Sequence, residues 1–365
     1  MCEYKNYYIL LYYMVKEKPS FFSQGSYGCT TFPPITCKTV NPHVRNISKV
    51  VKNDFFSKHE LHLGKRLSEI VEKEHIKDSK LFLYYYQSCE TNRQLLKKEH
   101  GFYEKCKLFE DSATLPKHDS FVILYGEYVS SITNSLFFKQ HFTLKNIYLF
   151  YSFSLKALSI LKKYKIIHMD LNSRNIIVSN INPPTFHMID FGLSLEEPKC
   201  YQSNGELNLE YLKYFLIYEP TYYFWSMDRH IISYLFHKRA IPNQSQLKEL
   251  IHTVLSSDAW LKQFYGTSYD TYVQDTYTYY EKKCSSSTSF MDLMVHLWKE
   301  TCYTWDMYSI SYFCLKQIHM NVLKIQVNEG YDDFCTLLKK NIHFDYTRRP
   351  NIQLQINEFL KLLKK

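Results

Sequence analysis

Two polar clusters set inside apolar segments constrain this chain of 365 residues more than any other feature of its sequence. Residues 166–178 read IIHMDLNSRNIIV, and residues 186–192 read FHMIDFG. Asp170 and Asn175 lie five residues apart, and Asp190 follows Asn175 after 15 residues. Each alone would be an ordinary polar turn residue, but a short loop between apolar strands would bring them together. One carboxylate could then accept a proton while the amide and the other carboxylate hold a cation such as Mg²⁺.

The composition is that of a folded protein with either two compact units or one two-lobed unit. Hydrophobic residues make up 45% of the chain and charged residues 22%, unlike a disordered or collagen-like sequence. The apolar run from Tyr7 to Val15 is too short to span a bilayer and leads into charged residues rather than a cleavage site. We therefore expect a buried strand there and no transmembrane segment.

Charge and cysteine usage narrow the class of protein further. The net charge of +9 is spread along the chain without an arginine-rich block, so nucleic acid is not expected as the main ligand. The ten cysteines include no C-x-x-C pair. This pattern predicts neither a zinc ribbon nor a disulfide framework, and it favours a reducing, cytoplasmic compartment.

The order of strand and helix patterns predicts an α+β fold with two lobes. Segments rich in β-branched and aromatic residues predict strands at 7–15, 25–31, 46–51, 81–86 and 121–129. Helical spacing of apolar residues predicts helices at 57–72, 144–164 and 353–363. The strands therefore belong mainly to the front of the chain and the helices to the back.

The two polar clusters resemble the catalytic loop and the D-F-G element of protein kinases, in which H-R-D-L-x-x-x-N is followed by D-F-G. This resemblance implies that Asp170 accepts the proton of the acceptor hydroxyl and that Asn175 and Asp190 bind Mg²⁺ or Mn²⁺. Arg174 lies four residues after Asp170, as in the loop of tyrosine kinases, and could steady the transferring phosphoryl group. The resemblance to protein kinases also implies a small β-rich lobe at 1–126 and a larger helical lobe at 127–365.

The resemblance extends to a glycine-rich turn that would cover the phosphates of ATP. Gly25, Ser26, Tyr27 and Gly28 match the second half of G-x-G-x-x-G, with Ser23 in place of the first glycine. Glycine allows the backbone to approach phosphate closely. An ordinary hairpin turn is the alternative for this short match.

Lys49 occupies the place of the strand lysine that pairs with the ATP phosphates in the family. Strand alternation points Lys49 inward among apolar neighbours, whereas its rival Lys52 begins a polar turn. The helix partner of Lys49 should be Glu60, while Glu69 and Glu72 are expected to face solvent.

The apolar segment 121–129 is similar to the strand that ends at the hinge between kinase lobes. By this match the backbones of Glu127 and Val129 would bind adenine, and Gly126 would open a back pocket. An edge strand with a bulge at Gly126 is the alternative.

Two later motifs extend the match over about residues 20–360. Asp306 would buttress the catalytic loop from a buried helix, and Arg349 would pair with Asp228 at the end of the activation segment. The connection at about 229–304 is enlarged. Its many tyrosines fit either internal packing or a docking surface.

Departures from the family pattern define the alternatives. Met169 replaces the arginine of H-R-D, so activity should not require phosphorylation within residues 194–223 unless another basic residue such as Lys199 or Lys213 takes its place. Asn172 stands two residues after Asp170, where the kinase family usually has a lysine. These departures, with the missing first glycine, make a catalytically weak scaffold the first rival to an ATP-dependent protein kinase. A small-molecule phosphotransferase is the second rival, because such enzymes share the H-x-D-x-x-x-x-N loop, although the D-F-G element and the Arg349-Pro350 motif favour a protein kinase.

The Gly25–Cys29 turn with the prolines at 33 and 34, together with the aromatic residues 223–225, is similar to divergent serine/threonine kinases of large cytoplasmic DNA viruses. This narrower resemblance implies viral or host protein substrates, serine or threonine acceptors in preference to tyrosine, and a location in host cytoplasm or virion.

Overall fold

The computed structural model describes residues 20–25, 27–43, 45–77, 80–109, 120–324 and 330–364. The chain divides into two units. The first comprises the described residues up to Ser131 together with His187–Leu193, and the second comprises Ile132–Phe186 and the described residues from Ser194 onward. The D-F-G element at residues 190–192 therefore belongs to the first unit, although it follows the catalytic loop in sequence.

The first unit is built on an antiparallel sheet with the strand order β1-β2-β3-β5-β4. The strands are β1 (Ser20–Gln24), β2 (Gly28–Phe32), β3 (Asn46–Lys52), β4 (Tyr85–Asn92) and β5 (Ser120–Glu127). The helical segments are α2 (Phe55–Lys73), α3 (Arg93–Leu96), α4 (His100–Tyr103) and the 3₁₀ turn η3 (Phe191–Leu193). Helix α2 packs against both β4 and η3.

Local sequence explains why these elements form. Asp54 caps α2 by accepting a hydrogen bond from the Ser57 amide, and the Ser57 hydroxyl completes a capping box. The central strands β3 and β5 are buried on both faces. Val50 joins one apolar cluster with Ile123, and Val51 joins another with Leu124.

Most of the expected elements are present, with one clear exception. The helix expected at 57–72 is α2, and the strands expected at 46–51 and 121–129 are β3 and β5. The prediction for 81–86 was wrong, because β4 begins at Tyr85 and continues to Asn92. The strand expected at 7–15 lies outside the described residues.

The prediction of no disulfide framework was also wrong. Cys29 is bonded to Cys106 and Cys37 to Cys89, across 77 and 52 residues of sequence. Both bonds lie in the first unit, where the sheet brings distant segments together. Cysteine spacing along the chain does not record such neighbours.

The second unit is mainly helical. Its helices are α5 (Asn134–His141), α6 (Leu144–Lys163), α7 (Leu209–Leu212), α8 (Met227–Lys238), α9 (Gln244–Ser256), α10 (Ala259–Tyr265), α11 (Tyr269–Ser286), α12 (Phe290–Thr301), α13 (Trp305–Met320), α14 (Tyr331–Asn341) and α15 (Ile352–Leu362). Short 3₁₀ turns are η4 (Glu197–Cys200), η5 (Gly266–Ser268), η6 (Cys302–Thr304), η7 (Val322–Lys324) and η8 (Tyr346–Arg348). The helices expected at 144–164 and 353–363 are α6 and α15.

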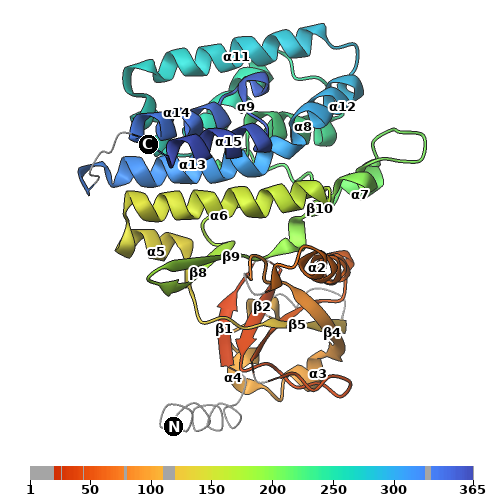
Figure 1. Ribbon diagram of the computed structural model, residues 1–365. Coiled ribbons are helices and arrows are strands. Elements are labelled where there is room, and N and C mark those ends of the chain that lie inside the picture. The colour runs from red at the N-terminus through yellow and green to blue at the C-terminus, as the bar shows by residue number, and fades with distance from the viewer. Residues whose placement is uncertain are drawn as a thin grey trace. The chain divides into compact units, whose positions relative to one another are not determined.

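Helix α13 is the centre of this unit. It lies beside α6 and α14, as Figure 1 shows, and is buried along its first three turns. Short strands accompany the helices: β7 (Ile166–Ile167) pairs with β10 (Leu195–Glu196), and β6 (Ile132–Thr133), β8 (Ile176–Ile181) and β9 (Pro184–Met188) form a small sheet. The mixed α+β class, with an antiparallel sheet in one unit and mainly helices in the other, is confirmed.

The enlarged connection at 229–304 folds as α8 to α12. Some of its tyrosines pack internally: the Tyr265 and Tyr272 rings stack at 4.2 Å, and Tyr280 is fully buried. Packing therefore accounts for these three tyrosines. No helix in the described part of the chain is both long enough and apolar enough to cross a bilayer.

Candidate active site

A buried ion pair in the first unit joins Lys49 of β3 to Glu60 of α2. The Lys49 Nζ lies 2.9 and 3.0 Å from the two carboxylate oxygens of Glu60, and the residues are 7% and 5% exposed. Lys52, three residues later, is exposed. The inward orientation of Lys49 and its contact with Glu60 are confirmed, because strand alternation and helix packing direct the two side chains toward each other.

Asp190 brings a second carboxylate to the same lysine. Its Oδ1 lies 3.5 Å from the Lys49 Nζ, and its side chain is 44% exposed. Burial lowers the pKa of Lys49, but the charges of Asp190 and Glu60 outweigh it and raise the pKa above its ordinary value. The lysine is therefore a fixed positive charge at neutral pH.

The glycine-rich turn connects β1 to β2. The Gly25 amide donates to the Gly28 carbonyl at 2.8 Å, which closes the hairpin. A side chain at Gly28 would collide with the Val50 carbonyl, so this position requires glycine. Tyr27 is exposed and stacks on Phe56 at 5.1 Å, and Ser26 lies outside the described residues.

Gly126 lies within β5, between β3 and β4, so the alternative of an edge strand is excluded. The register irregularity is in the opposing strand β4, between Tyr85 and Gln87. The expectation that Gly126 opens a back pocket was wrong, because an added Cβ there would lie 2.8 Å from the Tyr84 carbonyl oxygen. The absence of a side chain at Gly126 therefore allows the backbone at Tyr84 to pack against β5. Glu127 is exposed and pairs with Lys80, and Val129 follows β5 as irregular backbone.

The second unit brings together the residues of the expected catalytic loop. The Asn175 amide nitrogen donates to Asp170 Oδ2 and to the Asp170 carbonyl, both at 2.8 Å. The Asn172 amide donates to Asp170 Oδ1 at 3.2 Å. Arg174 is exposed, and its backbone amide donates to Asn172 Oδ1 at 2.8 Å. The loop thus fixes the orientation of the Asp170 carboxylate.

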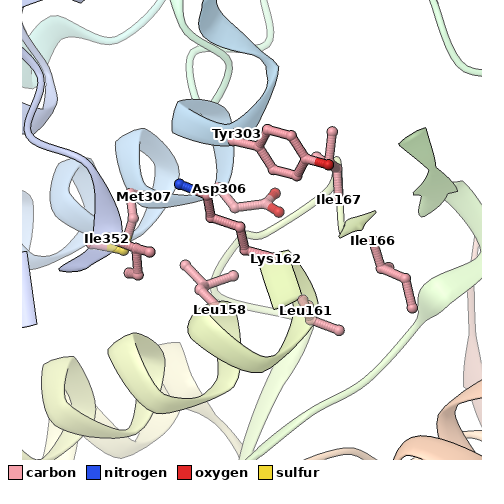
Figure 2. Close-up of a pocket in the computed structure, with 9 residues that line it drawn as sticks. All are labelled: Leu158, Leu161, Lys162, Ile166, Ile167, Tyr303, Asp306, Met307 and Ile352. Carbon is pink, nitrogen blue, oxygen red and sulfur yellow. The ribbon is translucent and has the colours of Figure 1, made fainter. Parts of the chain in front are cut away.

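Asp306 of α13 supports this loop from beneath. Its carboxylate accepts hydrogen bonds from the His168 amide at 2.7 Å and the Met169 amide at 3.0 Å. Burial raises the pKa of Asp306, although His168 and these amide donors act in the opposite direction. The expected buttressing contact is therefore present. Figure 2 shows Asp306 at the edge of a cavity of about 20 Å³, which has room for about one water molecule.

Arg229, which no motif in the sequence singles out, also contacts this loop. It is 1% exposed in α8, and its Nη1 donates to the Met169 carbonyl, which also accepts from Trp225 Nε1 at 3.2 Å. The guanidinium lies over the Trp225 ring, 3.6 Å from its centroid. Burial lowers the pKa of Arg229 to about 9, so the group stays charged at neutral pH.

This arrangement bears on the missing arginine of the H-R-D pattern. The two lysines suggested as substitutes form ion pairs elsewhere, Lys199 with Glu196 and Lys213 with Glu210. Arg229 instead supplies the buried positive charge next to Met169. Its position just after the end of the activation segment follows from the packing of α8, which no local pattern in the sequence indicates.

The expected pair between Asp228 and Arg349 is confirmed as a contact. Arg349 Nη2 lies 2.7 Å from Asp228 Oδ1, and both side chains are inaccessible to solvent. Asp228 Oδ2 accepts further hydrogen bonds from Ser226 at 2.9 Å and from Trp305 Nε1 at 2.6 Å. The pair ties the start of α8 to the C-terminal helices.

Two residues carry oxygen atoms that suit a hard cation such as Mg²⁺. Because the Asn175 nitrogen donates to Asp170, its Oδ1 is the amide atom left to face a cation, and no described residue donates to it. Asp190 supplies a partly exposed carboxylate in the first unit. Within the described ranges, no group of three or more His, Cys, Asp or Glu residues could hold a metal by itself. Each of the two positions therefore offers an oxygen donor of the type that Mg²⁺ prefers.

No protein-family model matches this chain, and comparison with curated proteins finds no match.

Proposed function

We propose that this chain is a protein kinase that transfers the γ-phosphate of ATP to hydroxyl groups of proteins, with serine or threonine favoured over tyrosine. The observation that carries the proposal is the Lys49–Glu60 pair with Asp190 beside it. A fully charged lysine held between two carboxylates is costly to bury, and a site for phosphate and a metal cation is a reason to keep it.

Each residue has a defined role in the proposed reaction. Lys49, aligned by Glu60, would pair with the phosphates of ATP, and the Gly25–Gly28 turn would cover them. Asp170 would accept the proton of the attacking hydroxyl, while Asn172 and Asn175 hold its carboxylate in place. Arg174 is exposed and would approach the transferred group.

Asn175 and Asp190 would hold Mg²⁺, or Mn²⁺ in its place. When bound, the cation supplies positive charge that offsets the charge of the phosphate oxygens. The backbones of Glu127 and Val129 would bind adenine. Because these groups mainly position and neutralise the substrates, most of the rate enhancement would come from alignment and electrostatics.

A labelled-ATP assay tests the proposal. The purified full chain is incubated with γ-labelled ATP, Mg²⁺ and a mixed set of protein and peptide acceptors that carry serine, threonine or tyrosine. Transfer that is lost in Asp170→Asn is the expected result. Transfer to sugars or amino alcohols without transfer to proteins would instead identify a small-molecule phosphotransferase.

A nucleotide-binding scaffold without transfer is the second candidate. It is favoured by Asn172, which stands where the family has a lysine, and by Tyr222, whose hydroxyl donates a hydrogen bond to Asp170 Oδ1 at 2.7 Å. Saturable ATP binding with no transfer to any acceptor would support the scaffold and contradict the enzyme.

A further inference from the structure

The residue before Asp170 has a backbone conformation that residues with side chains rarely adopt. Met169 has a φ of 71°, in the left-handed region, and is 1% exposed. Such a conformation persists only where the surrounding groups hold it. The Met169 carbonyl and the Asp170 amide belong to one planar peptide group. A group that holds this carbonyl therefore also sets the direction from which Asp170 projects.

Three side chains from other parts of the second unit hold the backbone of Met169. Its amide donates to Asp306 Oδ1 of α13 at 3.0 Å. Its carbonyl accepts from Trp225 Nε1 at 3.2 Å and from Nη1 of Arg229, which lies in the first turn of α8. The amide and the carbonyl of this residue are thus both bonded to side chains, Asp306 at one end and Arg229 with Trp225 at the other.

Two tryptophan rings fix the position of Arg229. Its guanidinium lies over Trp225, 3.6 Å from the ring centroid, and 5.8 Å from the centroid of Trp305. The planar guanidinium stacks on aromatic faces in a way that the lysine ammonium does not. From this stacked position Nη1 donates to the Met169 carbonyl.

Packing alone does not explain this arginine. It is 1% exposed, yet its Nε and Nη2 have no hydrogen-bond partner in the part of the chain that the structure describes, although buried donors are normally paired. Burial lowers the pKa of Arg229, and the negative charge of Asp170 is the strongest of the effects that oppose this change. The fold thus keeps a costly buried cation that acts on Asp170 and donates to the residue before it.

We infer that Arg229 is a positioning residue for Asp170, the general base of the proposed reaction. This inference rests on the proposed function. By donating to the Met169 carbonyl, Arg229 holds the peptide group from which Asp170 projects. The amides of Asn172 and Asn175 then orient the carboxylate itself. Arg229 acts through Asp170 and not on ATP or the acceptor, so its contribution belongs to kcat.

The test measures steady-state kinetics of the full chain with ATP, Mg²⁺ and a protein acceptor. We expect Arg229→Met to lower kcat at least about 30-fold, while the KM values for ATP and for the acceptor change by less than about threefold. Arg229→Lys keeps the charge and a donor but not the stacking group. It should have a kcat at least about fivefold higher than that of Arg229→Met.

Arg349→Met is the matched control. Arg349 is also a buried arginine of the second unit, and it bonds to Asp228 and to the His343 carbonyl. This variant should lose stability and keep kcat within about threefold of wild type when the assay runs well below its melting temperature. The comparison separates the loss of a buried cation in general from the loss of the contact with Met169.

Amide hydrogen exchange adds a measurement that does not depend on activity. Peptides that cover residues 166–175 should exchange faster in Arg229→Met than in wild type, because the Met169 carbonyl has lost a donor. In Arg349→Met the same peptides should exchange as in wild type. If Arg229→Met does not fold, Arg229→Lys takes its place, with an expected loss of at least about threefold in kcat and faster exchange over 166–175.

The outcomes separate the positioning role from the proposed function. A wild-type kcat in folded Arg229→Met would overturn the positioning role and leave the kinase proposal intact. A rise in the KM for ATP at unchanged kcat, or unchanged exchange over 166–175, would also overturn it. An equal loss of kcat in Arg349→Met, or no recovery in Arg229→Lys, would assign the effect to packing. Failure of the wild type to transfer phosphate to any acceptor would overturn both proposals.

Discussion

The Lys49 ammonium lies 2.9 Å from the Glu60 carboxylate within the first unit, and both side chains are almost inaccessible to solvent. A strand residue and a helix residue 11 positions apart thus form one buried charged unit. Such a pair is expensive to desolvate, so its presence calls for a functional reason.

Replacing this lysine tests that reason. We expect Lys49→Met to lower kcat by at least about 100-fold, because the charge that aligns the ATP phosphates is lost. Lys52→Met is the matched control, since Lys52 is exposed in the same strand, and should change kcat by less than about threefold. Steady-state kinetics with ATP as the varied substrate measures both. A larger loss in Lys52→Met would contradict the assignment.

Asp190→Asn should abolish phosphoryl transfer and leave the fold intact. The change removes one negative charge from the proposed metal ligand without altering side-chain size. The partly exposed Asp190 carboxylate has little role in the core, so the melting temperature without nucleotide should stay within a few degrees of wild type. Calorimetry and the labelled-ATP assay check the two statements. Full activity in this variant would exclude Asp190 as a metal ligand.

The Asp228–Arg349 pair should contribute to stability and not to chemistry. Arg349→Met leaves the Asp228 carboxylate buried without its ionic partner, and we expect a loss of about 3–5 kcal/mol in the free energy of unfolding. Adding Asp228→Asn should recover part of this loss, because the uncompensated charge is removed. Urea denaturation of Arg349→Met, Asp228→Asn and the double variant measures the coupling. Equal losses in the single and double variants would argue against it.

Because His230 is buried, we expect the stability of the second unit to fall at acid pH. It is buried in α8, and burial together with the Arg229 charge lowers its pKa from 6.5 to about 3. Between these values the unfolded chain binds a proton that the folded chain does not. The free energy of unfolding should therefore fall by up to about 1.4 kcal/mol for each pH unit below about 6.5.

Denaturation at about pH 7.5 and about pH 5.5 measures this contribution. His230→Gln should lose less stability on acidification than wild type, by about 1.4 kcal/mol. His252→Gln, which changes an exposed histidine of α9, should behave as wild type does. The same acid sensitivity in His230→Gln would assign it to other groups.

The two disulfides predict that reductant destabilises the first unit. The Cys29–Cys106 bond spans 77 residues, and closing a loop of this length contributes about 4.5 kcal/mol in the chain-entropy account. A reducing agent should lower the unfolding midpoint of the wild type but not that of the variant Cys106→Ser, Cys89→Ser. Peptide mapping of the unreduced chain should recover both linked pairs. Recovery of four free thiols after oxidative preparation would contradict the bonding pattern.

Local sequence patterns were enough to predict the helices whose buried residues recur with helical spacing. Helices α2, α6 and α15 were predicted from apolar spacing, and their bounds agree within two residues. Strand β4 was misplaced because the aromatic residues 84–86 resemble a strand centre. In the structure, Tyr85 and Tyr86 begin a strand that continues through a mostly polar stretch to Asn92. Its hydrogen bonds to β5 decide this, and they involve residues far away in sequence.

The sequence alone determined the α+β class, the inward direction of Lys49, and the grouping of Asp170 with Asn175, because each depends on spacing within a single strand, helix or loop. Only the tertiary structure decided which cysteines bond, what fills the space beside Gly126, and that Tyr222 and Arg229 converge on the catalytic loop. Those contacts join segments about 40 to 80 residues apart. The physical reason is that side-chain neighbours across such distances are set by packing of whole elements, which leaves no periodic trace in the chain.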